Sequence, residues 1–162
     1  MIAIGNVQAK IKVYIENKPP LAPYNSLNSC LPLKENDIAT IAQEAGNHWR
    51  KIFNVYAKLA FELNPQHFNT WQQLREQTLL QQDSAQCLVF SKPSICQSPV
   101  EITIVMGKTY AASLGLAERC YWLTPHFAIN ESLKLIICPY FDYRQLSNEK
   151  ITQLVGLIKP LQ

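Results

Sequence analysis

The residues best suited to bind a ligand lie directly after the most strand-like run of the sequence. The segment 139–144 contains two tyrosines, an aspartate and an arginine: Tyr140, Asp142, Tyr143 and Arg144. Aromatic rings can stack on a flat heterocycle, and an arginine can meet a phosphate or carboxylate with two parallel hydrogen bonds. The segment predicts a site for a planar or anionic ligand. The alternative is that Phe141 fills the core while Asp142 and Arg144 form a surface pair.

A second group of candidates stands where a predicted strand passes into a short helix, at Gly107, Lys108 and Thr109. The order glycine, lysine, threonine is similar to the end of a phosphate-binding loop. That loop needs a glycine five positions before Gly107, and the chain has Ile102 there. Two interpretations remain for Gly107 and Lys108. The turn could offer its first N–H groups to a single anion, or the glycine could serve close packing alone.

Asn17 and His126 are the candidate catalytic residues. His126 follows Thr124 and Pro125 at a predicted strand end, where a general acid or base can reach a ligand. The alternative is an ordinary loop histidine.

No serine-hydrolase elbow, zinc-protease motif or paired-cysteine spacing occurs, so the sequence predicts neither a metal nor a cofactor.

Hydrophobic periodicity indicates the elements that must position these residues. Ile11, Val13 and Ile15 alternate with polar neighbours and predict a strand. Apolar runs predict further strands at 86–90, 101–106, 120–124 and 133–138. Apolar residues at helical spacing predict helices at 36–63, 70–82, 108–114 and 147–158. Gly46 and Asn47 interrupt the first of them, and we favour a break there, with Asn47 capping the second piece.

Strands that alternate with helices along 162 residues predict one α/β domain over 1–162. The runs 86–90, 102–106 and 133–138 are apolar almost throughout, as in strands buried on both faces. This pattern favours a three-layer α/β/α fold with a largely parallel central sheet. Parallel strands end at one edge, so Asn17, Gly107 and Tyr140 are expected around a common hollow.

Composition limits the location and the partners. A net charge of +3 is too small to predict nucleic-acid binding. Some positive charge does lie on the first predicted helices, at His48, Arg50, Lys51 and Lys58. No apolar stretch reaches the ~18 residues of a membrane span, and the N-terminus has no secretory signal. The five cysteines lack metal-site spacing and predict reduced thiols in a cytoplasmic protein.

Two segments of the second half resemble the uracil-DNA glycosylase superfamily. The segment 102–112 is similar to the family's strand that leads into a glycine-led helix, and 135–144 is similar to the strand whose loop enters beside a flipped base. Asn17 falls where the family places a water-positioning Asp or Asn. The resemblance implies the family's fold and, as an alternative function, cleavage of a nucleobase N-glycosidic bond.

The chain departs from that family at two places. Cys138 stands where the family has its loop histidine, and Glu16–Pro20 lacks the family's glycine-led pattern. The resemblance therefore extends to the fold more than to the activity. The chain also has the general look of a small bacterial protein.

Two functions from different classes follow. The first is a binding protein without intact catalytic motifs, which takes a planar or anionic small ligand, or a protein partner, at the strand ends. The second is a base-processing enzyme in which Asn17 and His126 face one cleft with the 140–144 loop. The sequence leaves open which of them holds, and it leaves the oligomeric state open.

Overall fold

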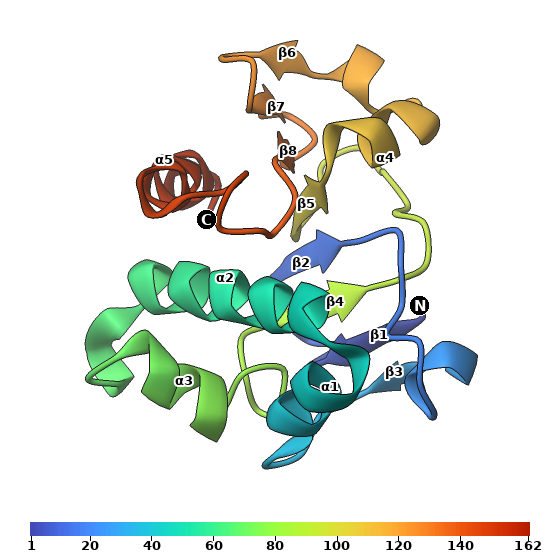
Figure 1. Ribbon diagram of the computed structural model, residues 1–162. Coiled ribbons are helices and arrows are strands. Elements are labelled where there is room, and N and C mark those ends of the chain that lie inside the picture. The colour runs from blue at the N-terminus through green and yellow to red at the C-terminus, as the bar shows by residue number, and fades with distance from the viewer.

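The computed structural model describes residues 1–162 and centres on an eight-stranded sheet of order β3-β1-β4-β2-β5-β8-β7-β6 (Figure 1). The strands are β1 (Ala3–Gly5), β2 (Ile11–Tyr14), β3 (Cys30–Leu31), β4 (Cys87–Val89), β5 (Ile102–Met106), β6 (Tyr121–Trp122), β7 (Ala128–Asn130) and β8 (Leu135–Cys138). The helices are α1 (Asp37–Ala45), α2 (Asn47–Leu63), α3 (Trp71–Gln77), α4 (Lys108–Ser113) and α5 (Asn148–Ile158). The chain combines this sheet with five helices, and the predicted α/β class is confirmed.

The central strands β4, β2, β5 and β8 are neighbours and run parallel. Val13 of β2 pairs with Leu88 on one side and Ile104 on the other, and all three side chains are buried. The outer pairings β1–β4, β7–β8 and β6–β7 are antiparallel, which makes the whole sheet mixed. The carboxyl ends of the four central strands therefore lie at one edge.

The helices cover the two faces of the sheet unequally (Figure 1). On one face, α1, α2, α3 and α5 enclose a cluster of 33 buried residues that includes Phe53, Ile104 and Leu154. On the other, α4 and the turn Ala117–Arg119 pack near a smaller cluster of 13 residues. The sequence of β5 alternates between the two clusters, with Ile104 in the larger one and Val105 in the smaller one.

The break predicted in the first helix is present, because α1 ends at Ala45 and α2 begins at Asn47. Gly46 between them has a φ of 93°, which side-chain-bearing residues avoid. The prediction that Asn47 caps α2 is wrong, because Gly46 occupies the cap position and no side chain bonds there. Thr70 caps α3, since its Oγ1 accepts a hydrogen bond from the Gln73 N–H at 3.1 Å.

The cysteines are all free thiols, and Cys87 and Cys138 lie wholly within the sheet. Burial, with the neighbouring Cys30 thiol, raises the pKa of Cys87 to about 12. Burial also raises the pKa of Tyr14 on the adjacent β2 to about 12.

No helix has the length and apolar character needed to cross a membrane.

The free energy of unfolding is expected to fall as the pH rises from about 9 to about 12. The native pKa of Cys87 lies above its ordinary 9.0, and that of Tyr14 lies above 10.0, so the folded chain holds both protons more tightly than the unfolded chain. The protonated thiol and phenol therefore stabilise the folded state fully at pH values below the pKa values of the unfolded chain. This contribution is lost as the pH rises through the pKa values of the folded chain. Urea denaturation at a series of pH values measures the decline. Cys87→Ala should make it shallower, and an unchanged slope would assign it to other groups.

Candidate ligand-binding site

Segments that follow three of the parallel strands come together at one edge of the sheet. Glu16 follows β2, and its charge adds to burial in raising the pKa of Tyr110 on α4 and of Tyr140 after β8. Gly107 follows β5, and a Cβ added there would lie 3.8 Å from Cδ2 of Tyr140. That distance is an ordinary van der Waals contact, so the Tyr140 ring packs beside the β5–α4 turn, and the φ of +102° is what favours glycine there.

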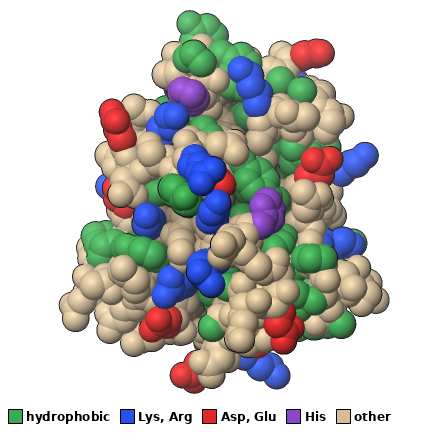
Figure 2. Space-filling model, in the orientation of Figure 1, with side chains coloured by type: hydrophobic (Ala, Val, Ile, Leu, Met, Phe, Trp, Pro, Cys, Tyr) green, Lys and Arg blue, Asp and Glu red, His purple; other side chains and the backbone are tan.

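A cavity of about 360 Å³ opens at this edge, between the start of α4, the β6–β7 turn and the β8–α5 loop. Four of the side chains proposed from the sequence line it, Lys108, His126, Tyr140 and Arg144, and Gln145 and Lys150 complete its polar wall. No aspartate or glutamate is among its lining residues. Lysine and arginine side chains gather on the viewed face in Figure 2, with histidine at the margins of the group. The size falls within the usual range of small-molecule sites, and the lining charge favours an anion.

Lys108 is held in place by the β6–β7 turn. Its Nζ donates a hydrogen bond to the Pro125 carbonyl oxygen at 3.4 Å and lies 4.7 Å from the centroid of the Trp122 ring. The turn is itself fixed, because the N–H groups of His126 and Phe127 both donate to Thr124 Oγ1, at 3.0 and 3.2 Å. The hairpin therefore positions both His126 and the ammonium group of Lys108 at the cavity.

Tyr140 links the cavity to α2. Its hydroxyl lies 2.9 Å from Nε2 of His48, and the centroids of the two rings are 5.5 Å apart. Burial, aided by the charges of Glu16 and Asp142, raises the pKa of Tyr140 to about 12, so the phenol stays neutral at physiological pH. Sequence reasoning missed His48, because no local spacing relates it to a residue 92 positions away.

The remaining residues of the 139–144 segment point elsewhere. Phe141 is fully buried, with its ring 5.5 Å from that of Tyr56 on α2. Asp142 lies 3.8 Å from Lys51 Nζ, and it accepts a hydrogen bond from the Arg144 backbone N–H at 2.8 Å. Half-exposed Tyr143 lies beneath Lys51, whose Nζ is 5.1 Å from the ring centroid. Asp142 and Tyr143 thus contact Lys51 of α2 and do not line the cavity.

Asn17 and His126 are not brought to one cleft. Asn17 is exposed in the segment after β2 and is not among the residues that line the cavity. His126 lies beyond β6, and β5, β8 and β7 separate β2 from β6 in the sheet. Four strand spacings of about 4.8 Å give a lateral separation of roughly 19 Å between those two strands. His126 therefore lines the cavity, and Asn17 does not.

Cys138, at the end of β8, also lines the cavity. Burial raises the pKa of this thiol far above its ordinary value, so the sulfur is neutral and a poor nucleophile. Elsewhere in the chain, no group of three or more His, Cys, Asp or Glu side chains is placed to hold a metal ion. The cavity therefore offers cations, a phenol and an imidazole.

Comparison with known proteins identifies a family for this chain. The model of a family of unknown function matches residues 2–159, which is nearly the whole chain. No curated protein and no solved structure matches. The chemistry of the cavity is consequently the only guide to the function.

Proposed function

The chain belongs to DUF6942, a family of unknown function, and we propose that it binds a small planar anion in the cavity at the ends of its parallel strands. The observation that carries this proposal is the lining of that cavity, which has Lys108, Arg144 and Lys150 and no carboxylate. A ligand with a phosphate or carboxylate group would replace the water around these cations with charge-assisted hydrogen bonds. A nucleoside monophosphate is the simplest ligand of this class.

The arrangement supports a definite mode of binding. The Arg144 side chain is exposed and forms no ion pair, and its guanidinium carbon lies 5.6 Å from the centroid of the Tyr143 ring. A guanidinium has five N–H donors, so Arg144 can meet an oxyanion. Lys150 lies in the first turn of α5, whose N-terminal dipole adds to the attraction for negative charge. The ring of Tyr140 and the imidazole of His126 would then contact the planar part of the ligand.

Binding without catalysis is the function that this geometry supports best. Cleavage of an N-glycosidic bond would need Asn17 and His126 at one substrate atom, and Asn17 is absent from the cavity lining. The proposal takes the fold as three layers, with helices on both faces of a sheet whose central strands are parallel. It also takes the protein as cytoplasmic, as its free thiols favour.

Positive charge beside the cavity supports nucleic acid as a larger ligand of the same site. A neighbouring hollow of about 300 Å³ is lined by Arg50, Lys51, Lys58 and Tyr143. A single strand could place a terminal nucleotide in the first cavity and its backbone along α2. Comparing the affinity of a mononucleotide with that of a short oligonucleotide distinguishes the two ligands.

We expect AMP to bind with measurable heat in isothermal titration calorimetry and adenosine to bind at least about tenfold more weakly, because adenosine lacks the anion. Arg144→Gln should weaken AMP binding by about 10- to 100-fold, the usual effect of losing a charge-assisted hydrogen bond. Lys10→Gln is the matched control, because Lys10 is equally exposed but precedes β2 at the opposite edge of the sheet. Equal affinities of AMP and adenosine, or of the wild type and Arg144→Gln, would contradict the proposal.

A further inference from the structure

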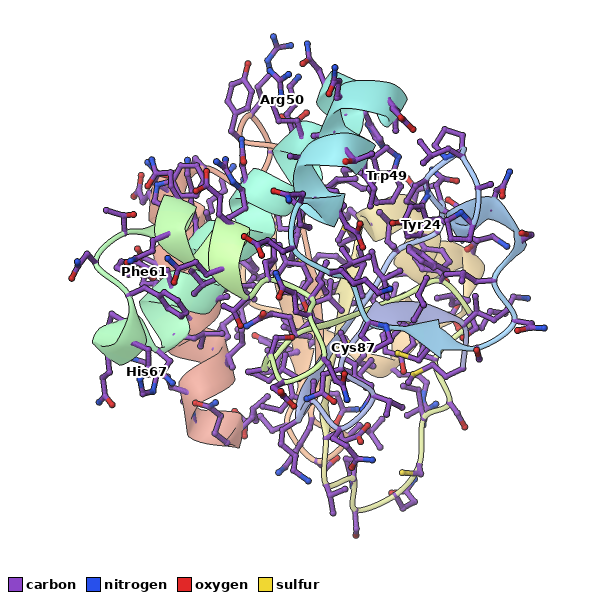
Figure 3. All side chains as sticks on the ribbon, turned by 90° about the horizontal axis from the view of Figure 1, so that it is seen from below. Tyr24, Trp49, Arg50, Phe61, His67 and Cys87 are labelled. Carbon is purple, nitrogen blue, oxygen red and sulfur yellow. The ribbon has the colours of Figure 1, made fainter.

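A second cavity, of about 390 Å³, lies among α1, α2 and α3 on the helical face of the sheet. Ile38 and Ala42 of α1 and Phe53 of α2 give it an apolar floor, and Arg50, Asn54 and Arg75 stand at its rim. It shares no lining residue with the cavity at the strand ends. Arg50 projects outward from the start of α2, next to α1 (Figure 3).

The hollow exists because α1 presents small side chains to its neighbours. Ala39 and Ala42 are three positions apart and therefore lie on one face of the helix. A larger side chain at either position would occupy the space between α1 and α3. Phe53 is fully buried and lies beneath the hollow as part of its lining.

Arg75 is held in a fixed orientation at the rim. One guanidinium nitrogen donates to Asn54 Oδ1 at 2.7 Å, and another donates to Glu76 Oε1 at 3.3 Å. The guanidinium carbon lies 5.3 Å from the centroid of the Trp71 ring. A guanidinium has five N–H donors, so this fixed group still has donors free for a ligand.

The charge around the cavity is not balanced. Lys34, Arg50 and Arg75 contribute positive charge, and Glu76 is the only carboxylate among the lining residues. The Glu76 side chain is 70% exposed, so solvent screens its pairing with Arg75. Lys34 and Arg50 form no ion pair. An acid group in the cavity would find a pre-oriented guanidinium and two further cations.

We propose that this second cavity binds a small organic acid with an apolar body. A carboxylate matches the planar fork of Arg75, and Arg50 stands at the same rim to share its charge. The hydrocarbon or ring of the acid would lie against Ala39 and Ala42, which removes apolar surface from water. The amide side chains of Asn36, Gln43 and Gln81 supply further hydrogen-bonding groups around the opening.

The test uses benzoate and phenylacetate as probes and benzamide as a neutral analogue of the same shape. Backbone amide NMR shifts of the full chain are followed during each titration. We expect shifts at residues of α1, α2 and α3, with benzamide binding about tenfold or more weakly than benzoate. Equal affinities of benzoate and benzamide would overturn the proposal, and so would the absence of shifts at these helices with both acids.

Variants separate this cavity from the one at the strand ends. Arg75→Gln should weaken the acid binding that is reported by the shifts at α1, α2 and α3 by about tenfold or more, whereas Arg144→Gln should leave those shifts unchanged. Ala42→Leu fills the hollow and should abolish binding, and Ala39→Leu provides the same test at an exposed position if the first variant does not fold. If these shifts are lost in Arg144→Gln and retained in Arg75→Gln, the proposal of a second site is refuted. The binding of AMP is a separate measurement, so its result would still hold.

Discussion

Replacing Phe141 with alanine is expected to lower the free energy of unfolding by about 3–5 kcal/mol. Phe141 has no exposed surface, and its ring meets the edge of Tyr56 with an interplanar angle of 82°. Truncation removes this aromatic contact and leaves a cavity that the surrounding strands and helices cannot close. Urea denaturation of the variant and the wild type, followed by circular dichroism, measures the difference.

The same substitution reports on the ligand site, because Phe141 is the buried anchor between Tyr140 and Arg144. A Phe141→Ala chain that still folds should bind AMP more weakly, since its loop is less well positioned. Tyr143→Ala is the matched control. Tyr143 is 51% exposed, so its loss should change stability by no more than roughly 0.5 kcal/mol. A loss of less than about 1 kcal/mol for Phe141→Ala would show that the ring does not anchor the loop.

Gly5→Ala is the second substitution expected to have a large effect, with a loss of about 3 kcal/mol or more. Gly5 has a φ of +116°, and a Cβ there would lie 2.5 Å from the Gln86 carbonyl oxygen and 3.0 Å from Cys87 Cα. Both atoms belong to the backbone at the start of β4, which pairs with β1. Relief of the contact requires the two strands to separate, so backbone strain and lost pairing add together.

Gly115→Ala provides the control for the strain alone. Gly115 also has a positive φ, of +71°, but nothing lies within 4 Å of an added Cβ. Its loss should be about 1–2 kcal/mol, the ordinary cost of a left-handed conformation. Thermal denaturation of the two variants tests the contact directly. Equal losses at both positions would mean that strand β4 accommodates the methyl group without moving.

The central elements could be predicted from the sequence because each has a strong local pattern. The alternation at Ile11, Val13 and Ile15 and the apolar run before Gly107 mark β2 and β5. Three of the outer strands had no such pattern. Strands β1 and β7 have three residues each and β3 has two, too few for a period of two to show. The antiparallel pairing of β1 with β4 and of β7 with β8, which makes the sheet mixed, depends on contacts that local patterns do not report.

Part of the candidate site could also be predicted from the sequence. Lys108, His126, Tyr140 and Arg144 could be proposed because each follows or flanks a predicted strand, and they line one cavity. The placement of Asn17 away from that cavity depends on the strand order, which a sequence pattern does not specify. The contact between His48 and Tyr140 and the lining role of Lys150 arise from the packing of α2 and α5 beside the β8–α5 loop.

The most direct test of the binding proposal is an NMR titration of the full chain with AMP, in which the shifted amides locate the ligand. The cavity at the strand ends predicts the largest shifts at Lys108, His126, Tyr140 and Arg144. It also predicts that Arg144→Gln reduces them at equal ligand concentration. Shifts confined to α1 and α3, or no shifts at any concentration, would contradict the assignment of the ligand site to the ends of the parallel strands.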